Sequence, residues 1–131
     1  MKSKIKAIIF DVGGVIANKP TSLIHKKISK KFDVDLKFLK MNYLIFSKKL
    51  QKGRIKENEF WKEFAKRCKI KNWRELKKNW INEFWKKVKI NKSVFNLAKE
   101  LKRKKYTVCV LSNANPFHKN STLAKKIKKE F

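Results

Sequence analysis

The sequence is poor in cysteine, in acidic residues and in long apolar runs, and each shortage excludes a class of protein. Its two cysteines, Cys68 and Cys109, are too few for a disulfide framework and lack metal-ligand spacing, so we predict that both are reduced packing residues. No stretch approaches eighteen consecutive apolar residues, which argues against a membrane-spanning helix. Because the amino terminus also lacks the pattern of a secretory signal, we expect a cytoplasmic protein with no membrane partner.

Acidic residues are scarce relative to basic ones. The chain has 10 Asp and Glu against 37 Lys and Arg, which gives a formal net charge of +27. Such an excess can indicate a nucleic-acid partner, because basic side chains neutralise phosphates and release counterions. Only four of the basic residues are arginines, however, and arginine is expected where phosphates or bases are recognised bidentately. The lysines are spread along nearly every helical segment, so we expect nonspecific adhesion at low salt rather than specific nucleic-acid binding.

The most informative segment lies near the amino terminus and reads IKAIIFDVGGV from Ile5 to Val15. Its apolar, β-branched run predicts a buried parallel strand that delivers Asp11 to the crevice beyond the carboxyl end of the strand. Gly13 and Gly14 follow, and without Cβ atoms their backbone N–H groups can approach an anion closely. Taken alone, Asp-x-Gly-Gly fits an aspartate that merely begins a turn equally well.

A second apolar, β-branched run extends over 106–113 and ends in a hydroxyl and an amide, those of Ser112 and Asn113, before Ala-Asn-Pro. The carboxyl ends of parallel strands meet at the same edge of a sheet. We therefore expect Asp11 to lie beside Ser112 and Asn113.

These two segments, IIFDVGGVI and CVLSNANP, resemble in order and spacing the first and second motifs of the haloacid dehalogenase-like (HAD) hydrolase superfamily. The stretch GRIKENEFW, from Gly53 to Trp61, resembles one that is common in the helical caps of sugar-phosphatase-like members. The resemblance covers essentially the whole chain. It implies an α/β fold in which a partial Rossmann-like core of parallel strands carries an inserted α-helical cap.

Between the two strands, apolar residues recur at steps of three and four, which predicts a series of amphipathic helices. Asp33 or Asp35 could cap the second helix, and Asn91 could cap the last. His25 stands alone on its helical segment and is interpreted as a surface or packing residue rather than a ligand. The predicted apolar faces include Leu23, Ile24, Ile28 and Phe32; Leu36, Leu39, Tyr43, Phe46 and Leu50; Phe60, Trp61, Phe64, Ala65 and Cys68; Trp73, Leu76, Trp80, Phe84 and Val88; and Val94, Leu97, Ala98 and Leu101.

The order of these segments predicts how the chain is organised. A helix directly before the second strand is half of a βαβ crossover. We therefore expect residues 1–17 and 90–131 to form the partial α/β core, and residues 18–89 to form the helical cap.

The resemblance implies a Mg²⁺-dependent phosphatase that acts on a small phosphorylated metabolite through an aspartyl-phosphate. Asp11 would be the nucleophile and a metal ligand, and the Gly13 carbonyl would be a second metal ligand. Phosphoryl oxygens would contact the backbone N–H groups after Asp11 and the polar residues after the second strand. The implied substrate-binding residues are Val12, Gly13, Gly14, Ser112 and Asn113.

Two departures from the family pattern affect the expected activity. Gly13 stands where most phosphatases of the superfamily carry a second aspartate that protonates the leaving group, and loss of a general acid costs about 10²–10⁴ in rate. This departure leaves open dehalogenase-like chemistry, which also lacks that acid. The sequence also ends at Phe131, before the lysine and the acidic pair that follow in family members, so we expect a truncated protein with weak or no activity. The alternatives are a noncatalytic phosphate-binding protein or a basic protein that associates with nucleic acid. Neither the substrate nor the oligomeric state is predicted.

Overall fold

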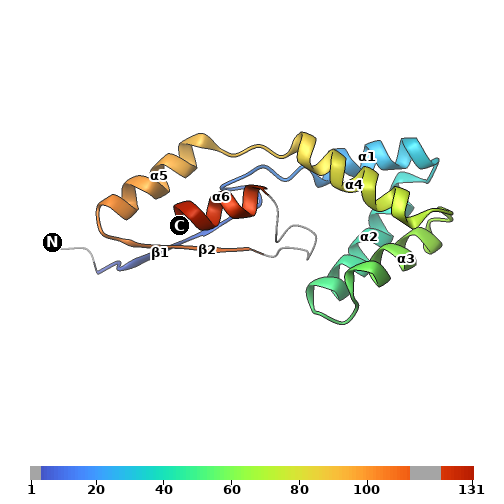
Figure 1. The fold of residues 1–131 in the computed structure, drawn as a ribbon, viewed down its shortest axis with the longest axis horizontal. Helices are drawn as coiled ribbons and strands as arrows, with labels where there is room; N and C mark the ends of the chain where they lie inside the picture. Colours follow the sequence, from blue (N-terminus) through green and yellow to red (C-terminus); the bar gives the residue numbers. More distant parts are fainter. Residues whose placement is uncertain (1–3, 113–121) are drawn as a thin grey trace. The chain divides into compact units, whose positions relative to one another are not determined.

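The computed structural model describes residues 4–112 and 122–131, which divide into two compact units. The α/β unit comprises the described residues up to 19 and from 88 onward, and the helical unit comprises Pro20–Lys87. The described part of the chain contains six helices and a two-stranded parallel sheet, and the helical unit is inserted between the first strand and the rest of the α/β unit (Figure 1). The predicted α/β class, with parallel strands and a helical insertion, is confirmed.

The sheet joins the beginning of the chain to a segment close to its end. Strand β1 (Ala7–Asp11) pairs in parallel with β2 (Thr107–Leu111), in a register that sets Ala7 opposite Thr107 and Asp11 opposite Leu111. Helix α5 (Lys92–Arg103) leads into β2, and helix α6 (Thr122–Glu130) follows it. This helix-then-strand order is expected where parallel strands need a crossover connection.

Among the residues that the structure describes, other elements cover only one face of the sheet. Phe10 packs with Phe95 and Ala98 of α5 and with Ile127 of α6, in one cluster of buried side chains. On the opposite face, Ile9 of β1 is 64% exposed. Leu111, at the end of β2 on the same face, is 70% exposed. The strand that the sequence predicted to be buried is therefore buried on one face only, whereas parallel sheets are ordinarily covered on both.

The helical unit is a four-helix bundle with an aromatic core. Helices α1 (Thr21–Phe32), α2 (Leu36–Gln51), α3 (Glu57–Arg67) and α4 (Trp73–Lys87) pack in a closed ring, in which α1 contacts both α2 and α4. The ring of Tyr43 stacks on that of Trp80 with 4.7 Å between centroids. The fully buried aromatic side chains are Phe60, Trp61, Phe64 and Trp80.

Two of the helices begin at residues that the sequence marks as caps. The Asp35 side chain accepts a hydrogen bond from the Phe38 N–H at 3.0 Å and begins α2, and Asn91 accepts one from the Val94 N–H at 3.3 Å and begins α5. Asp33 ends α1 instead, in a left-handed conformation with φ of 52°. None of the helices in the described ranges is long and apolar enough to cross a membrane.

Besides Ile9, three further residues that the sequence assigned to packed positions are exposed. Leu23 in the first turn of α1 is 54% exposed, and Leu97 of α5 is 50% exposed because α5 buries Phe95 and Ala98 instead. Cys109 lies opposite Ile9 in the sheet register and is likewise exposed, so the packing prediction is wrong for this cysteine. Periodicity located these apolar faces, but a face is buried only where another element covers it.

Candidate functional site

Asp11 and Ser112 lie at the carboxyl ends of the two paired strands. Asp11 is the last residue of β1 and stands opposite Leu111, so Ser112 is the next residue beyond that pair. Both residues are exposed. The sheet edge therefore presents a carboxylate and a hydroxyl-bearing residue one register step apart. Asn113, the third polar residue expected here, lies outside the described residues.

The turn after Asp11 is held by its own backbone hydrogen bonds. The Ala17 N–H donates to the Val12 carbonyl at 3.0 Å, and the Gly14 N–H donates to the Ala17 carbonyl at 2.6 Å. Gly14 has φ of 80°, a conformation that glycine adopts without strain. The Gly14 N–H is thus bonded within the turn in this structure. The substrate-binding roles of Val12, Gly13 and Gly14 stay predictions.

Lys19 lies against this same turn, and sequence reasoning missed it. Its aliphatic carbons pass so close to Gly13 that a Cβ added there would meet Lys19 Cε at 3.0 Å. The amino group of Lys19 is thus carried beside the loop that follows Asp11. With 33 lysines in the sequence, no pattern distinguishes this one from the lysines on solvated helix faces.

The residues described do not form a metal site by themselves. Among them, no group of three or more His, Cys, Asp or Glu side chains is arranged to hold a metal ion. Asp11 and the Gly13 carbonyl offer one carboxylate and one carbonyl, and Mg²⁺ bound through so few ligands depends on waters and substrate phosphate. The amino group beside Gly13 adds a positive charge that would oppose a cation there. This set does not fit a resident Mg²⁺, and the expected cofactor stays a prediction.

His25 belongs to the core of the helical unit. It is 7% exposed, and its ring lies 4.9 Å from that of Tyr43 and 5.2 Å from that of Trp80, between centroids. Burial, with a smaller contribution from the positive charge of Lys40, lowers the pKa of His25 from 6.5 to about 4. The imidazole is therefore neutral near pH 7 and acts as a packing residue.

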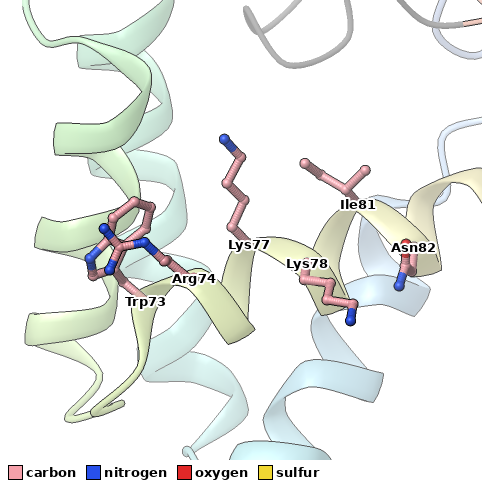
Figure 2. A pocket seen from close by; sticks show the side chains of 6 residues that line it. All are labelled: Trp73, Arg74, Lys77, Lys78, Ile81 and Asn82. Carbon is pink, nitrogen blue, oxygen red and sulfur yellow. The ribbon is translucent and has the colours of Figure 1, made fainter.

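Two open clefts are basic, and neither is lined by Asp11 or Ser112. One, of about 380 Å³, follows α4, where the Arg74 guanidinium lies over the Trp73 ring at 4.5 Å (Figure 2). Lys77 in this cleft pairs with Glu57 at 3.0 Å. The other, of about 520 Å³, lies between α5 and α6. It is lined by Asn96, Lys99, Lys102, Arg103 and Lys129.

No protein-family model matches the sequence, and no curated protein matches it significantly.

Proposed function

We propose that this protein is a HAD-like hydrolase that acts on a small phosphorylated metabolite, with Asp11 as the nucleophile. The observation that supports the proposal is the register of the sheet, in which Ser112 follows directly on the residue opposite Asp11. A carboxylate nucleophile and a hydroxyl donor at the same strand ends are suited to hold one phosphoryl group between them.

The proposed reaction has two steps. A carboxylate oxygen of Asp11 attacks phosphorus, the bond to the leaving oxygen breaks, and the leaving group departs with the bonding electrons and takes a proton from water. Water then attacks the aspartyl-phosphate, which releases inorganic phosphate and restores the carboxylate. The Ser112 hydroxyl would donate to a phosphoryl oxygen in both steps.

Gly13 affects which phosphate esters the protein can hydrolyse at a useful rate. Gly13 has no side chain that could protonate a leaving group, so departure of an ordinary alcohol should be slow by about 10²–10⁴. Phosphate esters whose leaving group is stable as an anion should suffer much less from this loss. We therefore expect acetyl phosphate or an aryl phosphate to react faster than a sugar phosphate.

Phosphate release from acetyl phosphate and from a sugar phosphate tests the proposal, together with mass spectrometry of the peptide that contains Asp11. Asp11→Asn should abolish both the release and the covalent phosphoryl adduct. Asp33→Asn is the matched control, because Asp33 is an exposed aspartate whose left-handed conformation asparagine also tolerates. Equal activity in native protein and Asp11→Asn would refute the proposal.

A second candidate is a noncatalytic basic protein that associates with nucleic acid, and the two basic clefts favour it. Arg74 and Lys62 both lie over the Trp73 ring, however, so a base that stacked on this ring would compete with these cations. Binding of single-stranded DNA at increasing salt tests this candidate. A sequence preference that is lost in Arg74→Met would favour it, whereas weak and uniform binding would count against it.

A further inference from the structure

The side chain of Lys19 is packed onto the glycine turn at the candidate site. A Cβ added to Gly13 would meet Lys19 Cε at 3.0 Å and Cγ at 3.4 Å, and one added to Gly14 would meet Cε at 3.5 Å. Nζ is one bond of about 1.5 Å beyond Cε, so the ammonium group must lie near the backbone of these glycines. The absence of two Cβ atoms therefore lets a cation lie beside the loop that follows Asp11.

The backbone leading to Lys19 is fixed by three hydrogen bonds. The Asn18 N–H donates to the Lys89 carbonyl at 3.1 Å, and the Lys89 N–H donates to the Asn18 side chain at 2.6 Å. The Asn91 N–H donates to the Ile16 carbonyl at 2.7 Å. All these residues belong to the α/β unit. The backbone just before Lys19 is thus held in place by the α/β unit, which also carries Asp11.

A phosphate monoester at this sheet edge needs a positive charge. Asp11 is itself an anion, and two like charges brought together repel each other unless a cation intervenes. The described residues contain no cluster that would hold a metal ion. The lysine beside the glycine turn meets the same need, because an ammonium group makes strong charge-assisted hydrogen bonds to phosphate oxygens.

We propose that Lys19 binds the phosphoryl group at this edge and supplies the positive charge that a resident metal ion would otherwise provide. This inference rests on the proposed function and names its substrate class as phosphate monoesters bound without a metal requirement. The alternative is that Lys19 only covers the turn with its carbon chain. Phosphate binding requires the positive charge of Lys19, whereas coverage of the turn requires only its aliphatic carbon chain.

The affinity of the full chain for inorganic phosphate, measured in EDTA at physiological ionic strength, separates these roles. Lys19→Met keeps an unbranched side chain over the glycines and removes the charge. We expect it to weaken phosphate binding about tenfold or more while the melting temperature stays near that of the native protein. Lys125→Met is the matched control, an exposed lysine on α6 of the same unit, and it should change the affinity by about twofold or less.

Three results would overturn the role of Lys19: no measurable phosphate binding by the native chain in EDTA, equal losses in Lys19→Met and Lys125→Met, or binding that appears only with Mg²⁺. Failure of the proposed function gives a different pattern. If Lys19→Met lowers the affinity but Asp11 never forms the phosphoryl adduct, the anion site stands and the hydrolase proposal falls. If Asp11 is phosphorylated and Lys19→Met binds phosphate normally, the hydrolase proposal stands and the role of Lys19 falls.

Discussion

The helical unit is the better packed of the two units, whereas the α/β unit carries the candidate catalytic residues. In the helical unit, Trp61 and Trp80 are at most 1% exposed, and the four helices close around them. In the α/β unit, two strands expose one apolar face, with Ile9 64% exposed, yet this unit carries Asp11 and Ser112. Candidate sites on the less packed part of a molecule are expected, because binding segments tend to have low local stability.

The largest effect should come from the aromatic core of the helical unit. Trp80→Ala should lower the free energy of unfolding by about 3–5 kcal/mol, because it leaves a cavity among Tyr43, Phe64 and Trp61. Urea denaturation followed by far-ultraviolet circular dichroism measures this loss. A loss below about 1 kcal/mol would show that the bundle is not the better packed unit.

The two faces of β1 should respond very differently to truncation. Phe10→Ala removes a side chain packed with Phe95 and Phe131 and should cost about 3 kcal/mol. Ile9→Ala, next to it on the open face, should change stability by about 0.5 kcal/mol or less. Denaturation of both variants under one set of conditions makes the comparison. A similar cost at both positions would mean that the exposed face is covered in solution.

Acid should weaken the helical unit through His25. Its pKa is about 4 in the folded chain against 6.5 ordinarily, so below pH 6.5 the unfolded chain takes up a proton that the folded core excludes. Full stability is present above pH 6.5 and is lost as the pH falls toward 4, with a loss of about 2 kcal/mol by pH 5. His25→Phe removes the titrating group. Its unfolding free energy should vary less with pH, and an identical pH dependence in both proteins would contradict the assignment.

The smallest expected effect concerns stability least directly. The reactivities of the two thiols, Cys68 in the helical unit and Cys109 in the α/β unit, allow the units to be compared in the native protein without any substitution. Burial raises the pKa of the Cys68 thiol to about 11, so this thiol of the helical unit should stay unmodified in the folded protein. Cys109 is exposed on the open face of the sheet and should react with iodoacetamide. Peptide mapping after brief alkylation identifies the modified residue. Equal modification of both thiols would show that the helical unit opens readily.

The sequence predicted the elements better than their surroundings. Strong local signals located the strand that ends at Asp11 and the caps at Asp35 and Asn91, because capping and strand patterns depend only on residues that are close in the sequence. The same patterns cannot tell whether anything covers a face. Ile9 and Cys109 were therefore expected to be buried, and both are exposed.

The candidate site shows the same limit. Asp11 and Ser112 could be paired from the sequence because the ends of parallel strands meet at one edge. The Gly14 N–H could not be assigned, since its bond to Ala17 depends on how the turn closes. Lys19 could not be found because its position comes from three-dimensional folding of the turn and not from any spacing.

The rate at which acetyl phosphate phosphorylates Asp11, followed by mass spectrometry, tests most directly whether Asp11 and Ser112 act on one phosphoryl group. Ser112→Ala should slow this labelling about tenfold to a hundredfold, because a hydrogen-bond donor to the transferring group is lost. Ser93→Ala, at an exposed serine of α5, should leave the rate unchanged. No labelling of Asp11, or the same rate in Ser112→Ala as in the native chain, would contradict the account.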